Sequence, residues 1–89
     1  MRVTIRLFAR LRDLVGEGEL VRDLPPQSTV ATVWERLATE FPAIAPYAAS
    51  MSCAVNADYA RLTTAVRDGD EIAFLPPVSG GSSARNRRM

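Results

Sequence analysis

Hydrophobic and polar residues alternate strictly at the start of the chain. The apolar positions are Val3, Ile5 and Leu7, and polar residues separate them. This period of two predicts a strand with one buried face. Two glycines at positions 16 and 18 then predict a turn, and residues 20–24 have the composition of a returning strand that ends at a Pro-Pro pair. The two segments therefore predict an N-terminal hairpin with a long connection.

The apolar spacing changes to that of a helix after the hairpin. Ser28 or Thr29 is suited to cap this helix, and Pro42 is expected to end it. Apolar residues recur at i, i+3, i+4, i+7 and i+11 along one face, at Val30, Val33, Trp34, Leu37 and Phe41. A large aromatic side chain on the apolar face of a helix belongs first to the core. We therefore interpret Trp34 as a core residue and only secondarily as a binding residue.

The second half of the chain predicts further strands. Residues 43–50 are expected to form an irregular or short helical connection, and residues 51–56 alternate again as a third strand. Asn56-Ala57-Asp58 has turn chemistry, a short strand is expected after it, and residues 67–70 form a tight turn. The last strand spans residues 71–75, with Ile72 and Phe74 facing inward.

This order of elements predicts an α+β fold of the β-grasp (ubiquitin-like) class. A crossover helix between two hairpin-like halves implies a mixed sheet of four to five strands, with one main helix packed on one face. A ferredoxin-like fold is the main competitor, but residues 57–70 lack the period of the second long helix that it requires. We expect one domain over residues 1–78, followed by a flexible tail over residues 79–89.

Composition narrows the chemistry that this chain can perform. Among its 89 residues there is no histidine, and Cys53 is the only cysteine. An internal disulfide cannot form, a structural zinc site is not expected, and a self-sufficient hydrolase lacks its usual general base. Cys53 points with the apolar set of its strand, so we interpret it as an inert, buried thiol. The apolar runs are too short to cross a bilayer and the first residues do not form a signal peptide, so a cytoplasmic protein without membrane association is expected.

The charged residues do not suggest a second activity. Residues 1–81 carry eight Arg against ten acidic residues (8 − 10 = −2), and three more Arg follow in residues 82–89. All basic side chains are Arg, so the chain offers no lysine for an isopeptide bond. The acidic residues near positions 17–23 and 68–71 lack the spacing of a calcium loop, and turns and strand edges explain them. Three arginines without interleaved aromatic residues give little grip on nucleic acid, which we do not expect as a partner.

The segment after the last strand is Pro76-Pro77-Val78-Ser79-Gly80-Gly81. The prolines keep the chain extended and prevent further strand pairing, while the two glycines remove side-chain bulk. A stiff Pro-Pro segment that leads to two residues without side chains suits a peptide that enters a partner's narrow active site. A Pro-, Gly- and Ser-rich tail without a task is the alternative when this segment is considered alone.

Three segments together resemble the small subunit of molybdopterin synthase (MoaD). They are residues 8–12, Val55-Asn56, and residues 68–81 with the sequence DGDEIAFLPPVSGG, and the resemblance covers residues 2–81 in order. It implies a sulfur carrier in molybdenum cofactor biosynthesis. An E1-like adenylating enzyme (MoeB-like) uses ATP to activate the carboxylate of the terminal glycine, and sulfur then replaces AMP to give a thiocarboxylate. The carrier itself binds no cofactor.

The resemblance also assigns roles to residues. Gly81 bears the adenylate and the thiocarboxylate, and the tail enters the large subunit (MoaE-like), where the sulfur reaches a cyclic pterin precursor. Catalysis is then expected in the large subunit, and this chain is a non-catalytic subunit that acts as a cosubstrate. The residues expected to form or adjoin the docking surface are Phe8, Phe74, Leu75, Pro76, Pro77, Val78, Ser79 and Gly80.

The chain departs from the family pattern after Gly81, where residues 82–89 follow. Gly81 therefore has a peptide bond where the chemistry needs a free carboxylate. Three interpretations are open: a processing protease removes Ser82–Met89, the extension is an artefact, or the chain is a paralogue that carries no sulfur. We favour processing, by analogy with ubiquitin-like precursors. Alternative functions are sulfur delivery to thiamine, cysteine or tRNA thiolation, modification of lysines on other proteins, and a β-grasp interaction module with an inert tail.

Overall fold

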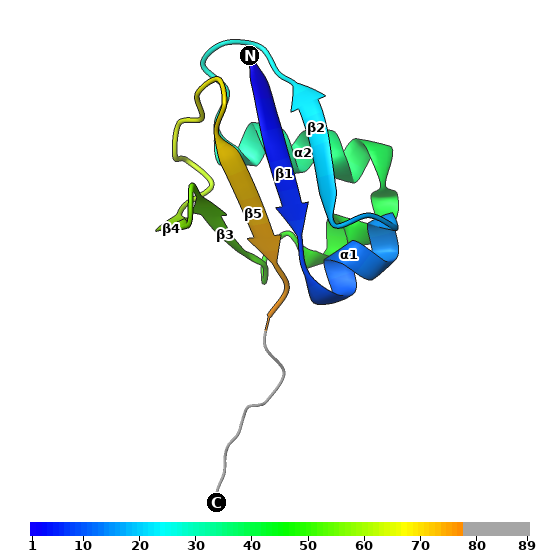
Figure 1. The fold of residues 1–89 in the computed structure, drawn as a ribbon. Coiled ribbons are helices and arrows are strands. Elements are labelled where there is room, and N and C mark those ends of the chain that lie inside the picture. Colours follow the sequence, from blue (N-terminus) through cyan, green and yellow to red (C-terminus); the bar gives the residue numbers. More distant parts are fainter. Residues whose placement is uncertain (78–89) are drawn as a thin grey trace, which may run out of the picture.

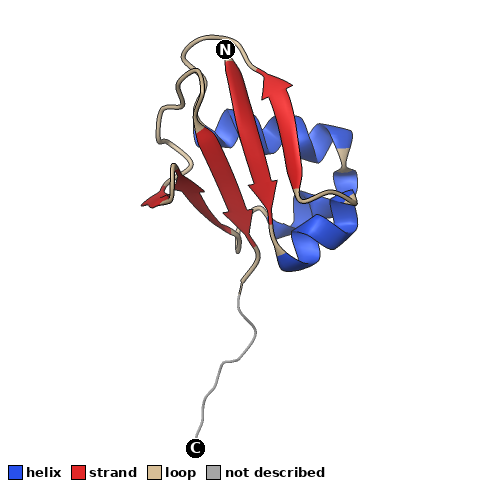
Figure 2. Cartoon of the chain, viewed as in Figure 1, coloured by secondary structure: helices blue, strands red, loops and turns tan. Residues whose placement is uncertain are grey.

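The computed structural model describes residues 1–77, which form a mixed sheet with its helices gathered on one face (Figures 1 and 2). The predicted boundary at residue 78 and the tail residues Val78, Ser79, Gly80 and Gly81 lie outside the described part. The elements, in chain order, are β1 (Arg2–Leu7), α1 (Ala9–Val15), β2 (Glu19–Asp23), α2 (Val30–Glu40), the 3₁₀ helix η1 (Pro42–Tyr47), β3 (Ser52–Val55), β4 (Asp58–Ala60) and β5 (Glu71–Leu75).

The sheet has five strands in the order β2-β1-β5-β3-β4. β1 and β5 are parallel, whereas the other neighbouring pairs are antiparallel. The crossover from the β1–β2 hairpin to the second half contains α2, as the β-grasp prediction requires. Between β3 and β5 the chain forms β4 and loops instead of a second long helix, which excludes the ferredoxin-like alternative.

The core lies between the sheet and α2. Val3, Ile5 and Leu7 are buried on β1, and Ile72 and Phe74 are buried on β5, which confirms the inward faces predicted for both strands. Trp34 on α2 is 5% exposed, so its interpretation as a core residue is confirmed. The remaining buried apolar residues are Leu11, Leu20, Leu24, Val30, Val33, Leu37, Ile44, Cys53 and Val66.

The long connection predicted between β1 and β2 is present, and it contains a helix, α1, that the sequence analysis did not predict. α1 spans only seven residues and buries one of them, Leu11. Its apolar positions Leu11, Leu14 and Val15 follow helical spacing, but about two turns of that pattern are hard to distinguish from a loop. Gly16 caps α1 in the left-handed region at φ 93°, and its N–H donates to the Arg12 carbonyl at 2.8 Å.

α2 begins where the sequence placed it, with Thr29 as the cap. The Thr29 Oγ1 accepts from the Thr32 N–H at 3.4 Å, and the Thr32 Oγ1 accepts from the Thr29 N–H at 3.1 Å. Ser28, the other candidate cap, is buried and donates through its hydroxyl to the Pro25 carbonyl at 2.7 Å. α2 ends at Glu40, and Pro42 opens η1 within the segment expected to be irregular or helical.

The predicted turns on the β3 side of the sheet are also present. Asn56 and Ala57 both have positive φ, 50° and 73°, as a two-residue hairpin between β3 and β4 requires. The side chain of Asn56 also donates to Asp70 Oδ1 at 2.9 Å and accepts from the Glu71 N–H at 3.0 Å. Asp68 Oδ1 accepts from the Arg2 N–H. Asp70 Oδ2 accepts from the Arg67 N–H within the turn at 2.8 Å, so hydrogen bonds to the turns and to the edge of β1 account for Asp68 and Asp70.

Candidate functional site

The last described residues follow β5, the central strand of the sheet. β5 lies between β1 and β3, so it is hydrogen-bonded on both sides. Because β1 and β5 are parallel, their carboxyl ends meet at one end of the sheet, where Leu7 is in register with Phe74. Phe8 and Leu75 follow these two residues, and Pro76 and Pro77 continue from there. We call Pro76 and Pro77 the root of the tail, and it starts at the end of the sheet where Phe8 lies.

The sheet face opposite the helices carries a row of outward residues across four strands. Ala73 on β5 is in register with Arg6 on β1 and with Ala54 on β3, and Ala54 is in register with Tyr59 on β4. The two alanines in the middle of this row are small, so the larger side chains around them enclose a depression. The volume of this depression is about 290 Å³, and a separate groove beside α2 is larger, at about 450 Å³. We call the depression the outer-face hollow, and it is lined by Phe8, Ala54, Ala57, Tyr59, Ala73 and Leu75.

Two aromatic side chains on the rim of this hollow are exposed. Tyr59 is 89% exposed and Phe8 is 39% exposed. Both belong to residue types that are enriched at protein interfaces. An apolar depression with exposed aromatic residues, next to the point where the tail leaves the sheet, has the features of a protein-docking surface.

A charged pair borders the hollow on the β1 side. Arg6 Nη1 lies 3.2 Å from Glu71 Oε2, and the Arg6 guanidinium carbon lies 5.8 Å from the centre of the Phe8 ring. Both charged side chains are more than two-fifths exposed, so their pair contributes little to stability. Its effect is to hold Arg6 against Phe8, which presents a cation beside the apolar surface.

The structure separates the predicted docking residues within residues 1–77 into three groups. Phe8 and Leu75 line the hollow, while Pro76 is half-buried and Pro77 is exposed at the root of the tail. Phe74 is fully buried, so it adjoins the docking surface from inside and does not present its ring to a partner. The tail residues Val78, Ser79 and Gly80, together with Gly81, lie outside the described residues.

Sequence reasoning missed four residues of the hollow: Ala54, Ala57, Tyr59 and Ala73. The alternation that placed Cys53, Ile72 and Phe74 inward also placed their neighbours outward, which was a usable signal. It did not show that the outward residues of separate strands would meet. That follows only from the register of β5 with β3 and of β3 with β4.

Cys53 provides no reactive thiol at this site. It is 5% exposed on β3, and its Sγ donates to the Ala60 carbonyl at 3.2 Å. Burial raises the pKa of the Cys53 thiol, which disfavours the nucleophilic thiolate. Within residues 1–77, no group of three or more His, Cys, Asp or Glu side chains is arranged to hold a metal ion. No helix in the same part of the chain is long and apolar enough to cross a membrane.

Comparison with known proteins places this β-grasp domain in a family. The model of the ThiS family matches residues 5–81, and the chain belongs to that family. The sulfur carrier subunit of molybdopterin synthase from Arabidopsis thaliana is 33% identical over 79 residues, covering 89% of this chain and 82% of the relative. The corresponding subunit from Escherichia coli is 34% identical over 83 residues, covering 89% and 99%.

A solved structure agrees with this assignment at the level of the fold. The crystal structure of SAMP1 from Haloferax volcanii superposes with a TM-score of 0.82 at 28% identity, covering 91% of this chain and all of that one. The predicted resemblance to the small subunit of molybdopterin synthase and the predicted ubiquitin-like fold are both confirmed.

Proposed function

We propose that this chain is the sulfur carrier of a molybdopterin synthase and delivers sulfur as a thiocarboxylate on Gly81. The observation that carries the proposal is the outer-face hollow, which opens beside the root of the tail on a domain whose relatives are sulfur carrier subunits. A carrier needs a docking surface close to its reactive end, because docking there sets where that end is delivered. The exposed Phe8 and Tyr59 and the half-buried Leu75 supply apolar contacts for a large subunit.

We assign the activation of the Gly81 carboxylate to a partner enzyme. The chain has no histidine, its one thiol is buried, and no metal cluster occurs in residues 1–77. This composition supports activation by a partner. An E1-like (MoeB-like) enzyme would form the Gly81 acyl adenylate from ATP with release of pyrophosphate, and a sulfur donor would then displace AMP. This domain contributes recognition and positioning.

The length of the tail fits such a delivery. Pro76 to Gly81 is six residues, which span at most about 20 Å when extended. Two prolines at the base limit the conformations of the segment before docking, which lowers the entropy lost when it enters an active site. The two terminal glycines fit a channel that side chains would block.

We also propose that a processing protease removes Ser82–Met89 before activation, because adenylation requires a free carboxylate on Gly81. Mass spectrometry of the protein from its own cells tests this directly. A chain that ends at Gly81 supports processing, and a chain that retains Met89 contradicts it. This measurement does not depend on which sulfur acceptor the carrier serves.

The sulfur-carrier proposal itself is tested with residues 1–81, an E1-like enzyme, ATP and a sulfur donor. We expect a mass gain equal to the exchange of one oxygen atom for one sulfur atom. Residues 1–80 are the matched control and should not gain this mass. Adding the large subunit and the cyclic pterin precursor should then return the carrier to its original mass. Loading without this return would favour delivery to thiamine, cysteine or tRNA thiolation.

A further inference from the structure

The outer side of β2 is an open edge of the sheet. β2 pairs with β1, and no strand among residues 1–77 pairs with its other side. Leu24 exchanges both backbone hydrogen bonds with Met1, and the Gly18 carbonyl accepts from the Leu7 N–H. Because hydrogen-bonded positions alternate along an antiparallel pair, the backbone groups of Glu19, Val21 and Asp23 face away from β1. These three residues form the free edge.

Val21 is the central residue of that edge and is 47% exposed. Consider an antiparallel strand that pairs with this edge and bonds to at least two neighbouring outward residues. Whatever its register, one of these residues is Val21, so the strand needs the Val21 backbone. An exposed apolar residue in the middle of a five-residue edge strand is the kind of feature that promotes edge-to-edge association. The opposite edge, β4, has only three residues and is already protected by its short length.

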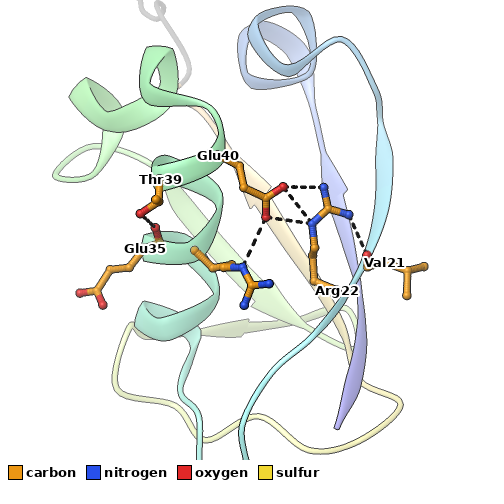
Figure 3. Close-up of polar contacts among 6 residues, drawn as sticks. Val21, Arg22, Glu35, Thr39 and Glu40 are labelled. Carbon is orange, nitrogen blue, oxygen red and sulfur yellow. Dashed lines mark hydrogen bonds and ion pairs between the residues drawn. The ribbon is translucent and has the colours of Figure 1, made fainter.

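The Val21 carbonyl is occupied by a side chain of its own strand (Figure 3). Arg22 Nη1 donates to the Val21 carbonyl oxygen at 2.8 Å. The same guanidinium is fixed on its other side by Glu40, the last residue of α2, with Nη2 to Oε1 at 2.7 Å and Nε to Oε2 at 2.9 Å. The Arg22 and Glu40 side chains are 26% and 30% exposed, so this pair is more enclosed than the other ion pairs of β2 and β5.

We propose that the Arg22–Glu40 pair blocks the free edge of β2. A second copy of this chain is thereby prevented from adding its own β2 to the sheet as a further strand. The guanidinium takes one of the two lone pairs of the carbonyl oxygen that every productive register needs, and it lies 2.8 Å from that oxygen, where an incoming N–H would have to approach. A charged donor makes a stronger hydrogen bond than a neutral amide, so an incoming N–H is a poor replacement. Displacing Arg22 would also disturb its three hydrogen bonds with Glu40. A carrier that must reach several partners as a free domain is thereby kept from pairing with itself.

The test compares the self-association of the wild-type chain and of the double variant Arg22→Gln/Glu40→Gln by sedimentation equilibrium. Both substitutions are made together so that neither Arg22 nor Glu40 remains as a charge without the other, and circular dichroism verifies that the variant is folded. We expect the dimerisation constant, expressed as an association constant, to increase by about tenfold. This is the effect of losing roughly one charged hydrogen bond from the monomer. Arg36→Gln is the matched control, because Arg36 contacts Glu40 at 3.5 Å but does not reach the edge. It should leave the dimerisation constant unchanged.

A third variant shows whether any association uses the edge. The Val21 N–H faces away from β1, so Val21→Pro in the double-variant background removes a donor for the incoming strand without removing a bond to β1. We expect this triple variant to return to the wild-type dimerisation constant. The proposal that the Arg22–Glu40 pair blocks the edge is wrong if the double variant is as monomeric as the wild type. It is also wrong if the association of the double variant persists with Pro at position 21.

Discussion

The ring of Phe74 packs edge-on against Trp34, with centroids 5.0 Å apart and ring planes at 66°. Phe74 is on β5 and Trp34 is on α2, so this contact joins the helix to the strand from which the tail leaves. Leu75, the next residue, faces the opposite side of the sheet and lines the outer-face hollow. The aromatic pair therefore fixes the strand on which the proposed docking surface and the root of the tail both depend.

Replacing Phe74 with Ala should destabilise the domain strongly. The side chain is fully buried, so its removal leaves a cavity and also removes the aromatic contact with Trp34. We expect a loss of about 3–5 kcal/mol in the free energy of unfolding, measured by denaturant titration. Phe8→Ala is the control because Phe8 is exposed, and its cost should stay below about 1 kcal/mol. Equal costs for the two variants would contradict the assignment of Phe74 to the core.

Substitutions in the outer-face hollow should weaken partner binding and leave stability nearly unchanged. Tyr59→Ala removes the most exposed aromatic side chain of the rim, and Ala73→Arg fills the hollow from its centre. We expect each to weaken binding to the large subunit by at least about tenfold, measured by calorimetry on residues 1–81. Val21→Ala is the matched control, since Val21 is an exposed apolar residue outside the hollow. If Tyr59→Ala binds normally, the docking surface lies elsewhere.

Acid should remove the contribution of the Arg22–Glu40 pair. The hydrogen bond from Arg22 holds the pKa of Glu40 below its ordinary value of 4.5. A lowered carboxylate pKa stabilises the fold above pH 4.5, and this contribution is lost as the pH falls through the lower, folded-state pKa. Glu40→Gln should cost about 1 kcal/mol at pH 7 and much less at pH 3, in unfolding titrations at both values. A cost that does not change with pH would show that packing, and not charge, explains the effect.

The hairpin between β3 and β4 should become more stable when Ala57 is replaced with Gly. Ala57 has φ 73°, a conformation that costs a residue with a Cβ roughly 1 kcal/mol. Gly69→Ala is the opposite test, because Gly69 has φ 86° and an added Cβ would meet no atom within 4 Å. We therefore expect Ala57→Gly to raise the free energy of unfolding by about 0.5–1 kcal/mol and Gly69→Ala to lower it by a similar amount. Changes of the same sign would rule out backbone conformation as the cause.

Much of the fold could be predicted because alternation reports which face of a strand is buried. The inward set on β1, the apolar face of α2 with Trp34, and the inward positions Ile72 and Phe74 were all predicted correctly. α1 was missed because its seven residues contain too few turns for a periodic signal and because Gly16 and Gly18 suggested a simple turn. The cap of α2 was left open between Ser28 and Thr29, since both carry a hydroxyl and only the backbone position decides which one caps.

The sequence alone determined which residues can enter a core, the absence of a histidine general base, and the Pro-Pro and Gly-Gly tail that suggests a carrier. These are properties of single residues and of short-range patterns, and they do not depend on how distant segments pack. Only the tertiary structure decided that Phe8, Tyr59 and Leu75 surround one hollow, that Phe74 lies beneath it, and that Arg22 reaches from Glu40 to the Val21 carbonyl. These relationships depend on strand register and on the contact between β2 and the end of α2, where residues far apart in the chain are brought within hydrogen-bonding distance.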